Sequence, residues 1–261
     1  MWKPLSRKIK KMGCQAKRRR QSGKMGEMDV AFQKLEKSRV TPRLLAMILC
    51  LMPLFATAAE ESIPIEQEPR HRLVFANEHV RYFDVELEPG YQSLYHWHRN
   101  DGVFVNISSA PTIAQDLGKD PVQRGERAIG ETYFIDYGAK PKAHRVSNPG
   151  STPYRVVDAE ILGGCGTSGP VAEGPRQTLL IDNARVFVTR IILHPGESTE
   201  LYAPCGVLVA VSAGRVSLET AGATQNVDLK PAEFQWRQQP DAVKLVNTGK
   251  FVFHGVDIRL K

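Results

Sequence analysis

The chain has 261 residues, with 35 lysines and arginines, 28 acidic residues and a net charge of +7. The positive charge is confined to the first 59 residues, which hold 14 lysines and arginines and three acidic residues. The rest of the chain has a net charge of −4, so it has no basic surplus to neutralise phosphates. The composition therefore argues against nucleic-acid binding by the body of the protein.

An apolar run extends from Leu44 to Ala59 after several arginines, and it ends with Ala56-x-Ala58. A basic flank, a short apolar run and small residues at its end are typical of a secretory signal peptide. The alternative is a membrane anchor, but a spanning helix needs about 20 apolar residues, and this run is shorter and contains Pro53. We expect cleavage here, export to the periplasm or the medium, and no stable membrane anchor afterwards.

Residues 1–43 are longer and more basic than the charged region of an ordinary signal peptide. We interpret them as a disordered leader or as a translation start placed too early; a nucleic-acid-binding tail is the alternative. The chain beyond the signal has two cysteines, Cys165 and Cys205. An oxidising compartment would allow them to form one disulfide, although two cysteines do not make a disulfide framework.

Period-two alternation begins near Leu73 and is clearest from residue 83 to 88, where apolar residues alternate with acidic ones. Further strand-like stretches cover residues 94–98, 103–107, 132–137 and 155–162. Residues 111–127 are polar without a clear period and are expected to form a loop. Short strands separated by turn signals about every ten residues predict an all-β sandwich or barrel.

A glycine-rich linker at residues 163–174 separates two similar units. Residues 77–90 align with residues 183–196 at an offset of 106, and both stretches end in Pro-Gly. Asn148, Gly150 and Asp158 align with Asn247, Gly249 and Asp257 at an offset of 99. The repeat predicts two β lobes, residues 60–165 and 166–261, after a leader of residues 1–59.

The first unit carries His96 and His98 one residue apart, and His144 follows later. Alternate side chains of a strand share one face, and neutral imidazole is the commonest metal ligand. All three histidines are absent together from the second unit, because their counterparts at these offsets are Tyr202, Pro204 and Val243. Ligands of one ion are useless singly, so this joint loss favours a metal site built from His96, His98 and His144 inside the first barrel.

These residues resemble the motifs of the cupin superfamily. Gly90, five residues and His96-x-His98 fit the first motif of that family, and His144 with Asn148 fits the end of the second, although its Pro-x-Gly pattern is not kept. The resemblance implies tandem jelly-roll barrels, a bicupin, whose second barrel has lost its metal site.

The sequence departs from the family at the acidic ligand, which should stand at residue 102 or 103, here Gly102 and Val103. Asp101 is the nearest carboxylate; a turn could bring it to the metal, or it could merely stabilise that turn. Without it, the site resembles the three-histidine iron site of cupin thiol dioxygenases. The resemblance favours Fe(II) or Mn(II), and imidazole ligands also suit Zn(II). Because ligation needs neutral imidazole, we expect metal binding to weaken below about pH 6.5.

The function expected from this resemblance is that of an exported metal-binding cupin, with dioxygenase-type oxidoreductase chemistry on a small molecule. The alternatives are a non-catalytic cupin that binds a small ligand around a structural metal, and a metal-dependent isomerase. Tyr137 is either a proton donor at the barrel mouth or a packing residue. The second lobe is expected to be structural or to be a dimerisation surface, which would make the protein a homodimer.

Overall fold

The computed structural model describes residues 61–261 except 167–173, 175, 203 and 239–240. The predicted leader and signal peptide lie outside these residues. Within the described part of the chain, no helix has the length and apolar character needed to cross a membrane.

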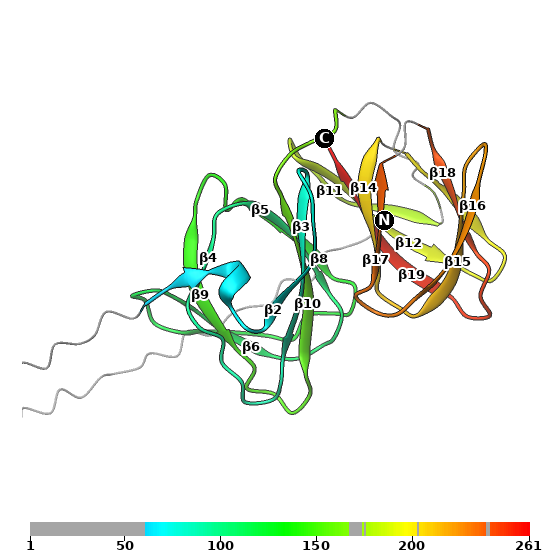
Figure 1. The fold of residues 1–261 in the computed structure, drawn as a ribbon. Coiled ribbons are helices and arrows are strands. Elements are labelled where there is room, and N and C mark those ends of the chain that lie inside the picture. The colour runs from blue at the N-terminus through cyan, green and yellow to red at the C-terminus, as the bar shows by residue number, and fades with distance from the viewer. Residues whose placement is uncertain (1–60, 167–173, 175, 203, 239–240) are drawn as a thin grey trace, which may run out of the picture. The chain divides into compact units, whose positions relative to one another are not determined.

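The first lobe consists of two five-stranded sheets (Figure 1), ordered β1-β4-β9-β6-β7 and β2-β3-β10-β5-β8. Its elements are β1 (Ile63–Pro64), the 3-10 turn η1 (Ile65–Gln67), β2 (His71–Ala76), β3 (Val80–Leu87), β4 (His96–His98), β5 (Asp101–Asn106), β6 (Thr112–Asp116), β7 (Val122–Arg124), β8 (Thr132–Ile135), β9 (Lys142–Ser147) and β10 (Tyr154–Ile161).

The second lobe repeats this plan with a five-stranded sheet, β11-β12-β19-β14-β17, and a four-stranded sheet, β13-β18-β15-β16. Its strands are β11 (Gln177–Asp182), β12 (Val186–Leu193), β13 (Ser198–Leu201), β14 (Cys205–Ala210), β15 (Gly214–Glu219), β16 (Thr224–Leu229), β17 (Phe234–Gln238), β18 (Val243–Asn247) and β19 (Phe253–Leu260).

Equivalent asparagines make equivalent hydrogen bonds in the two lobes. The Asn148 amide donates to the carbonyls of Leu87 and Thr152, at 2.9 and 2.8 Å. The Asn247 amide donates to the carbonyls of Leu193 and Phe251, both at 2.8 Å. Gly90 and Gly196, at the two Pro-Gly turns, have φ angles of 77° and 80°, which glycine adopts without strain. The structure thus confirms the repeat that the sequence predicts.

Strand β3 shows where the predicted alternation is incomplete. Phe83, Val85 and Leu87 pack inside the first barrel, as predicted. The opposite face is also covered, because Val80 and Tyr82 belong to a core shared with strands β12, β14 and β19. The Tyr82 hydroxyl donates to the Ala232 carbonyl at 2.9 Å. The strand is therefore buried on both faces along its first half, rather than half-buried.

The expected loop at residues 111–127 is wrong, because it contains the hairpin of β6 and β7. β7 is the last strand of its sheet, and all three of its residues are exposed. An edge strand with exposed side chains has no apolar face to produce a period-two pattern.

Candidate metal centre

The structure brings His96, His98 and His144 together. His96 and His98 lie at the two ends of β4, and His144 on the neighbouring strand β9 stands directly opposite His96. The ring centroids are 5.0 Å apart for His96 and His98, 4.9 Å for His96 and His144, and 4.8 Å for His98 and His144. Three imidazoles from two adjacent strands therefore converge inside the first barrel.

A fourth imidazole, that of His71 at the start of β2, joins them from the other sheet. Its ring centroid is 4.2 Å from that of His96 and 6.2 Å from that of His98. One ligand nitrogen from each of these three residues lies within 4.8 Å of the other two, which is close enough for a shared ion. Sequence reasoning missed His71, although the offset of 106, extended back six residues, pairs it with Gln177.

Acceptors face the Nδ1 atoms of three of these imidazoles. His71 Nδ1 lies 2.7 Å from a Glu68 carboxylate oxygen, and His96 Nδ1 lies 2.9 Å from the Leu94 carbonyl. His98 Nδ1 lies 3.5 Å from an Asp158 oxygen, which is longer than a hydrogen bond. Metal-binding histidines usually donate one ring N–H to such an acceptor, which fixes the tautomer and leaves the other nitrogen for the metal.

Glu68 is well suited to orient His71. Its buried carboxylate accepts the backbone N–H groups of Arg70 at 2.7 Å and Leu94 at 3.3 Å, besides its bond with His71. Burial alone would raise the pKa of Glu68, but these hydrogen bonds outweigh it, so the pKa is lowered and the group is an anion.

A divalent metal fits this site because a buried imidazole nitrogen lacks a hydrogen-bond partner. His96 Nε2 is buried and has no hydrogen-bond partner in the described part of the chain. Leaving a buried polar atom unpaired costs about 1–3 kcal/mol. A metal would satisfy this atom, and the neutral imidazoles around it suit Zn, Fe, Cu or Ni. The residues therefore fit a divalent metal site.

Asp101, predicted as a fourth ligand, points elsewhere. One of its carboxylate oxygens accepts the Gly138 N–H at 2.8 Å, and the other lies 3.1 Å from Nε of Arg185 in the second lobe. The turn after β4 thus directs the carboxylate away from the imidazoles, so its geometry does not support a ligand role. His71 lies with the imidazoles instead, and its ligand nitrogen groups with those of His96 and His98.

Gly102 also has a reason to be glycine. A Cβ there would lie 2.9 Å from the Phe104 ring and 3.0 Å from an Asp158 oxygen. The carboxylate that lies beside His98 therefore comes from β10, as Asp158, and not from β5. Asp158 is buried, and neither of its oxygens has a hydrogen-bond partner among the described residues.

The second lobe shows how such a buried aspartate is otherwise neutralised. Asp257, the counterpart of Asp158 on β19, forms an ion pair with the buried guanidinium of Arg237. The register places Arg237 opposite Gly206, as Ile135 lies opposite Gly102. The first lobe thus has isoleucine where the second lobe has the arginine, and a metal held by His98 would supply the missing positive charge.

The second barrel has no equivalent of the cluster. Leu201 pairs with Val243 as His96 pairs with His144, so the true counterpart of His96 is Leu201 rather than Tyr202. Leu201 and Val243 belong to an apolar core that fills the inside of the second barrel. The space taken by a polar cluster in one lobe is therefore packed with hydrocarbon in the other.

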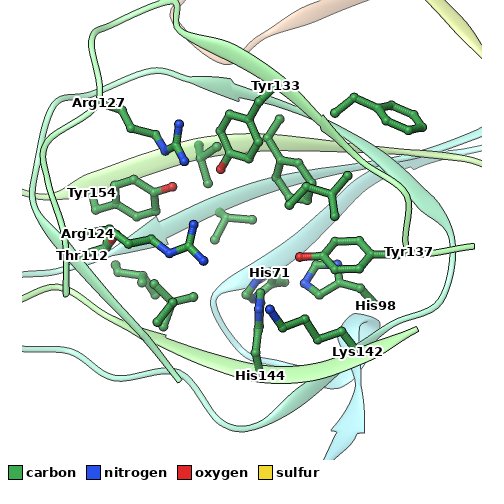
Figure 2. Close-up of a pocket in the computed structure, with 18 of the residues that line it drawn as sticks. His71, His98, Thr112, Arg124, Arg127, Tyr133, Tyr137, Lys142, His144 and Tyr154 are labelled. Carbon is green, nitrogen blue, oxygen red and sulfur yellow. The ribbon is translucent and has the colours of Figure 1, made fainter. Parts of the chain in front are cut away.

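A cavity of about 450 Å³ opens onto the cluster, and His71, His98 and His144 line one side of it (Figure 2). Tyr137 also lines it and stacks on His98 at a centroid distance of 4.6 Å. Burial raises the pKa of Tyr137, so its phenol stays protonated. A structural metal site is usually closed by protein ligands, whereas this one faces space for a small molecule.

Burial keeps the imidazoles of His96, His98 and His144 neutral. It lowers the pKa of His96 to about 3 and those of His98 and His144 well below 6.5, and the neighbouring imidazoles act in the same direction. The expectation that metal binding weakens below pH 6.5 holds for histidines with ordinary pKa values and is therefore corrected. The imidazoles of the folded cluster should stay neutral, and able to bind a metal, below that pH.

The same lowered pKa values make the metal-free protein less stable at low pH. In the unfolded chain the same histidines take up protons near pH 6.5, while in the metal-free fold they do not. We expect the free energy of unfolding of the metal-free protein to fall as pH drops below 6.5, by up to about 1.4 kcal/mol per pH unit for each of His96, His98 and His144. Urea unfolding of metal-free protein at pH 5, 6 and 7 measures this slope.

The exposed His194 in the second lobe supplies the control, because His194→Gln should leave the slope unchanged. An unfolding free energy that is flat between pH 5 and 7 would contradict neutral, buried imidazoles.

Comparisons with known proteins identify the fold. No family model matches the sequence, and no curated protein matches it. Among solved structures, AerE from Microcystis aeruginosa is 13% identical, covers 74% of this chain and 98% of its own, and has a TM-score of 0.53.

YhaK from Escherichia coli is 16% identical, with 72% and 87% coverage and a TM-score of 0.51. An oxalate decarboxylase from Bacillus subtilis is 10% identical, with 70% and 69% coverage and a TM-score of 0.50. These proteins have the cupin fold, and the similarity extends over both lobes. The chain is a two-lobed protein of the cupin fold, with a candidate divalent-metal centre in its first barrel.

Proposed function

We propose that this protein is an exported metal-dependent cupin that carries out dioxygenase-type oxidation of a small molecule in its first barrel. The observation that carries the proposal is the cluster of His71, His96, His98 and His144 facing a cavity of about 450 Å³. In such a site a divalent metal supplies Lewis-acid polarisation of a substrate oxygen or sulfur and, as Fe(II), reactivity toward dioxygen. The metal we favour is Fe(II) or Mn(II), with Zn(II) compatible with the same ligands.

The residues of the chain would divide the work. The four imidazoles would hold the metal, and Glu68 and Asp158 would orient two of them. The protonated phenol of Tyr137, beside His98, would donate a hydrogen bond to a negatively charged oxygen in the cavity. The apolar walls would exclude water from the reacting atoms.

Dioxygen consumption tests the proposal. Protein loaded anaerobically with Fe(II) should consume dioxygen steadily with at least one member of a panel of thiols, diketones and phenols. His96→Ala should abolish this uptake, and His194→Ala, on the surface of the second lobe, should not. Full iron loading without uptake across the panel would reject the oxidative chemistry and favour a non-catalytic ligand-binding cupin.

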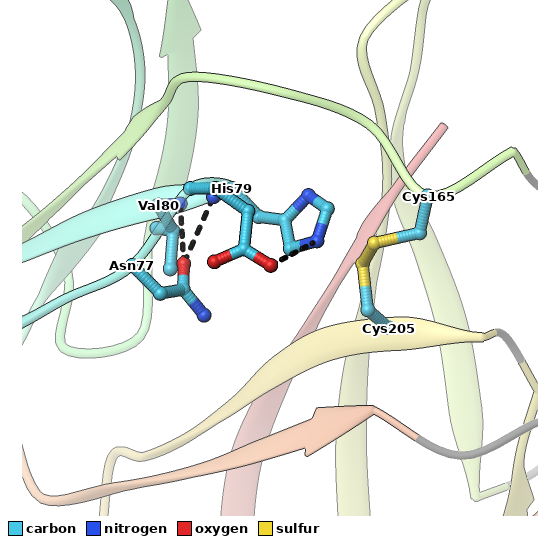
Figure 3. The surroundings of a disulfide bond; sticks show 6 residues. Asn77, His79, Val80, Cys165 and Cys205 are labelled. Atoms are coloured by element: carbon cyan, nitrogen blue, oxygen red, sulfur yellow. Dashed lines mark hydrogen bonds and ion pairs between the residues drawn. A yellow bond between two sulfur atoms is a disulfide. The ribbon is translucent and has the colours of Figure 1, made fainter.

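The disulfide between Cys165 and Cys205 supports export (Figure 3). Structural disulfides persist in oxidising compartments and are rare where thiols are kept reduced. His79 lies beside the bridge, but with both sulfurs bonded to each other this group does not offer a second metal site. Mass spectrometry of the secreted protein should find its N-terminus just after Ala58; an N-terminus upstream of Leu44 would reject cleavage there.

A further inference from the structure

The cavity beside the histidines has a second polar side, which metal binding alone does not explain. Figure 2 shows Arg124, Arg127, Tyr133 and Tyr154 across the cavity from the histidines, with both guanidinium groups directed inward. The lining of the cavity also includes apolar side chains, among them Val85, Leu87, Val146 and Val156. A ligand in contact with the histidines would therefore extend past hydrocarbon toward arginine.

The positive charges that line this cavity are not all balanced. Arg127 forms an ion pair with Glu131, and its guanidinium lies 4.1 Å from the centre of the Tyr133 ring. Lys142, which Figure 2 shows beside His144, is also paired, with Asp116 at 2.7 Å. No carboxylate of the described residues forms an ion pair with Arg124 or with Lys140. These two side chains give the cavity an uncompensated positive charge.

In the second barrel, apolar residues stand at positions equivalent to both polar sides of the cavity. The register places Val227 on β16 where Arg124 stands on β7, and Val216 where Thr112 stands. Tyr154 likewise corresponds to Phe253. Val216 and Phe253 belong to the core that fills the second barrel, and Val227 packs against it. A barrel without the histidines thus also lacks the arginine, as expected if both sides serve one ligand.

We propose that the first barrel selects a small carboxylate with an apolar body, whose far end carries the oxygen or sulfur that meets the metal. The planar guanidinium of Arg124 would donate two parallel hydrogen bonds to the carboxylate, a geometry that lysine does not offer. Lys140, which also lines the cavity, would add electrostatic attraction. This inference rests on the proposed function, because it takes the histidines to be the metal end of the same cavity.

Monohydroxamic acids of straight-chain dicarboxylic acids are the probes that test it. Their hydroxamate group chelates the metal whatever stands at the other end, and that end is either a carboxylate or the matched primary amide. Full-length mature protein reconstituted with Zn(II), which cannot undergo redox chemistry, is titrated calorimetrically with both members of each pair at several chain lengths.

We expect the acid to bind roughly 10- to 100-fold more tightly than the amide at one optimal chain length, as a charge-assisted hydrogen bond would give. Arg124→Gln should abolish this preference without changing the zinc content or the affinity for the amide. Lys140→Gln should reduce it less. Lys250→Gln, an exposed charge in the second lobe, should leave it intact.

The outcomes separate the two proposals. Equal binding of acid and amide, or a preference that survives Arg124→Gln, overturns the carboxylate inference while the metal site stands. Failure of the protein to retain zinc overturns the proposed function first. Retained zinc with no binding of either probe overturns the inference, because the cavity then does not admit a ligand between the two sides.

Discussion

Replacing His71 with glutamine should lower the affinity of the protein for a divalent metal by more than about 100-fold, whereas replacing Asp101 with asparagine should leave it unchanged. Loss of a residue that only orients a metal ligand costs 10- to 100-fold in affinity, so loss of a direct ligand should cost more. His71 lies within the imidazole cluster, while Asp101 is engaged with Gly138 and Arg185. Competition with a chromogenic chelator measures the affinity.

Glutamine is the informative substitution at residue 71, because the second lobe has a glutamine at the equivalent position. Gln177 occupies the equivalent place on β11 and donates to the Thr199 hydroxyl and the Glu200 carbonyl, both at 2.7 Å. The fold therefore accommodates this side chain there. His194→Gln is the matched control, and Asp101→Asn should cost at most about 1 kcal/mol of stability, since its ion pair is partly exposed. Metal lost with Asp101→Asn but kept with His71→Gln would restore the assignment made from sequence.

Most of what could be predicted about the fold came from the sequence repeat between the two lobes. It depends on backbone features that leave a local signature, such as the asparagines that bridge strands and the Pro-Gly turns. His96 and His98 were also visible locally, since a strand places alternate residues on one face. His71 was missed because the predicted strand alternation begins only near Leu73, and no local pattern distinguishes Glu68-x-x-His71 from other polar turns.

The carboxylate beside the imidazoles could not be predicted for a different reason. The sequence points to Asp101 because it is the carboxylate nearest to residues 102 and 103, where the family resemblance places the acidic ligand, but the position of a carboxylate in a barrel is set by strand pairing over long separations. Asp158, sixty residues further on, reaches His98 because β10 pairs with β5, and Gly102 leaves the space for it. The sequence marked Asp158 only as a repeated residue. Its role becomes visible once Asp257 is seen to have an arginine that Asp158 lacks.

Asp158→Asn should lower metal affinity by about 10- to 100-fold and at the same time stabilise the metal-free protein at pH 7. Burial, with Glu160 nearby, raises the pKa of Asp158 well above its usual range. A carboxyl whose pKa is raised by folding binds protons more tightly in the folded state, so it costs stability as pH rises above about 3.9. An uncharged amide avoids this cost, but it places no negative charge beside the imidazole of His98 and the metal that it would hold.

Asp257→Asn in the second lobe should give the opposite result, which makes the pair of variants decisive. There the carboxylate neutralises the buried guanidinium of Arg237, so its loss leaves an unpaired buried charge and should cost about 3–5 kcal/mol. Metal content should not change, because that barrel has no imidazole cluster among its described residues. Urea unfolding with and without metal measures both effects. If Asp158→Asn destabilised the metal-free protein as Asp257→Asn does, the buried carboxylate of the first lobe would be serving the fold and not the metal.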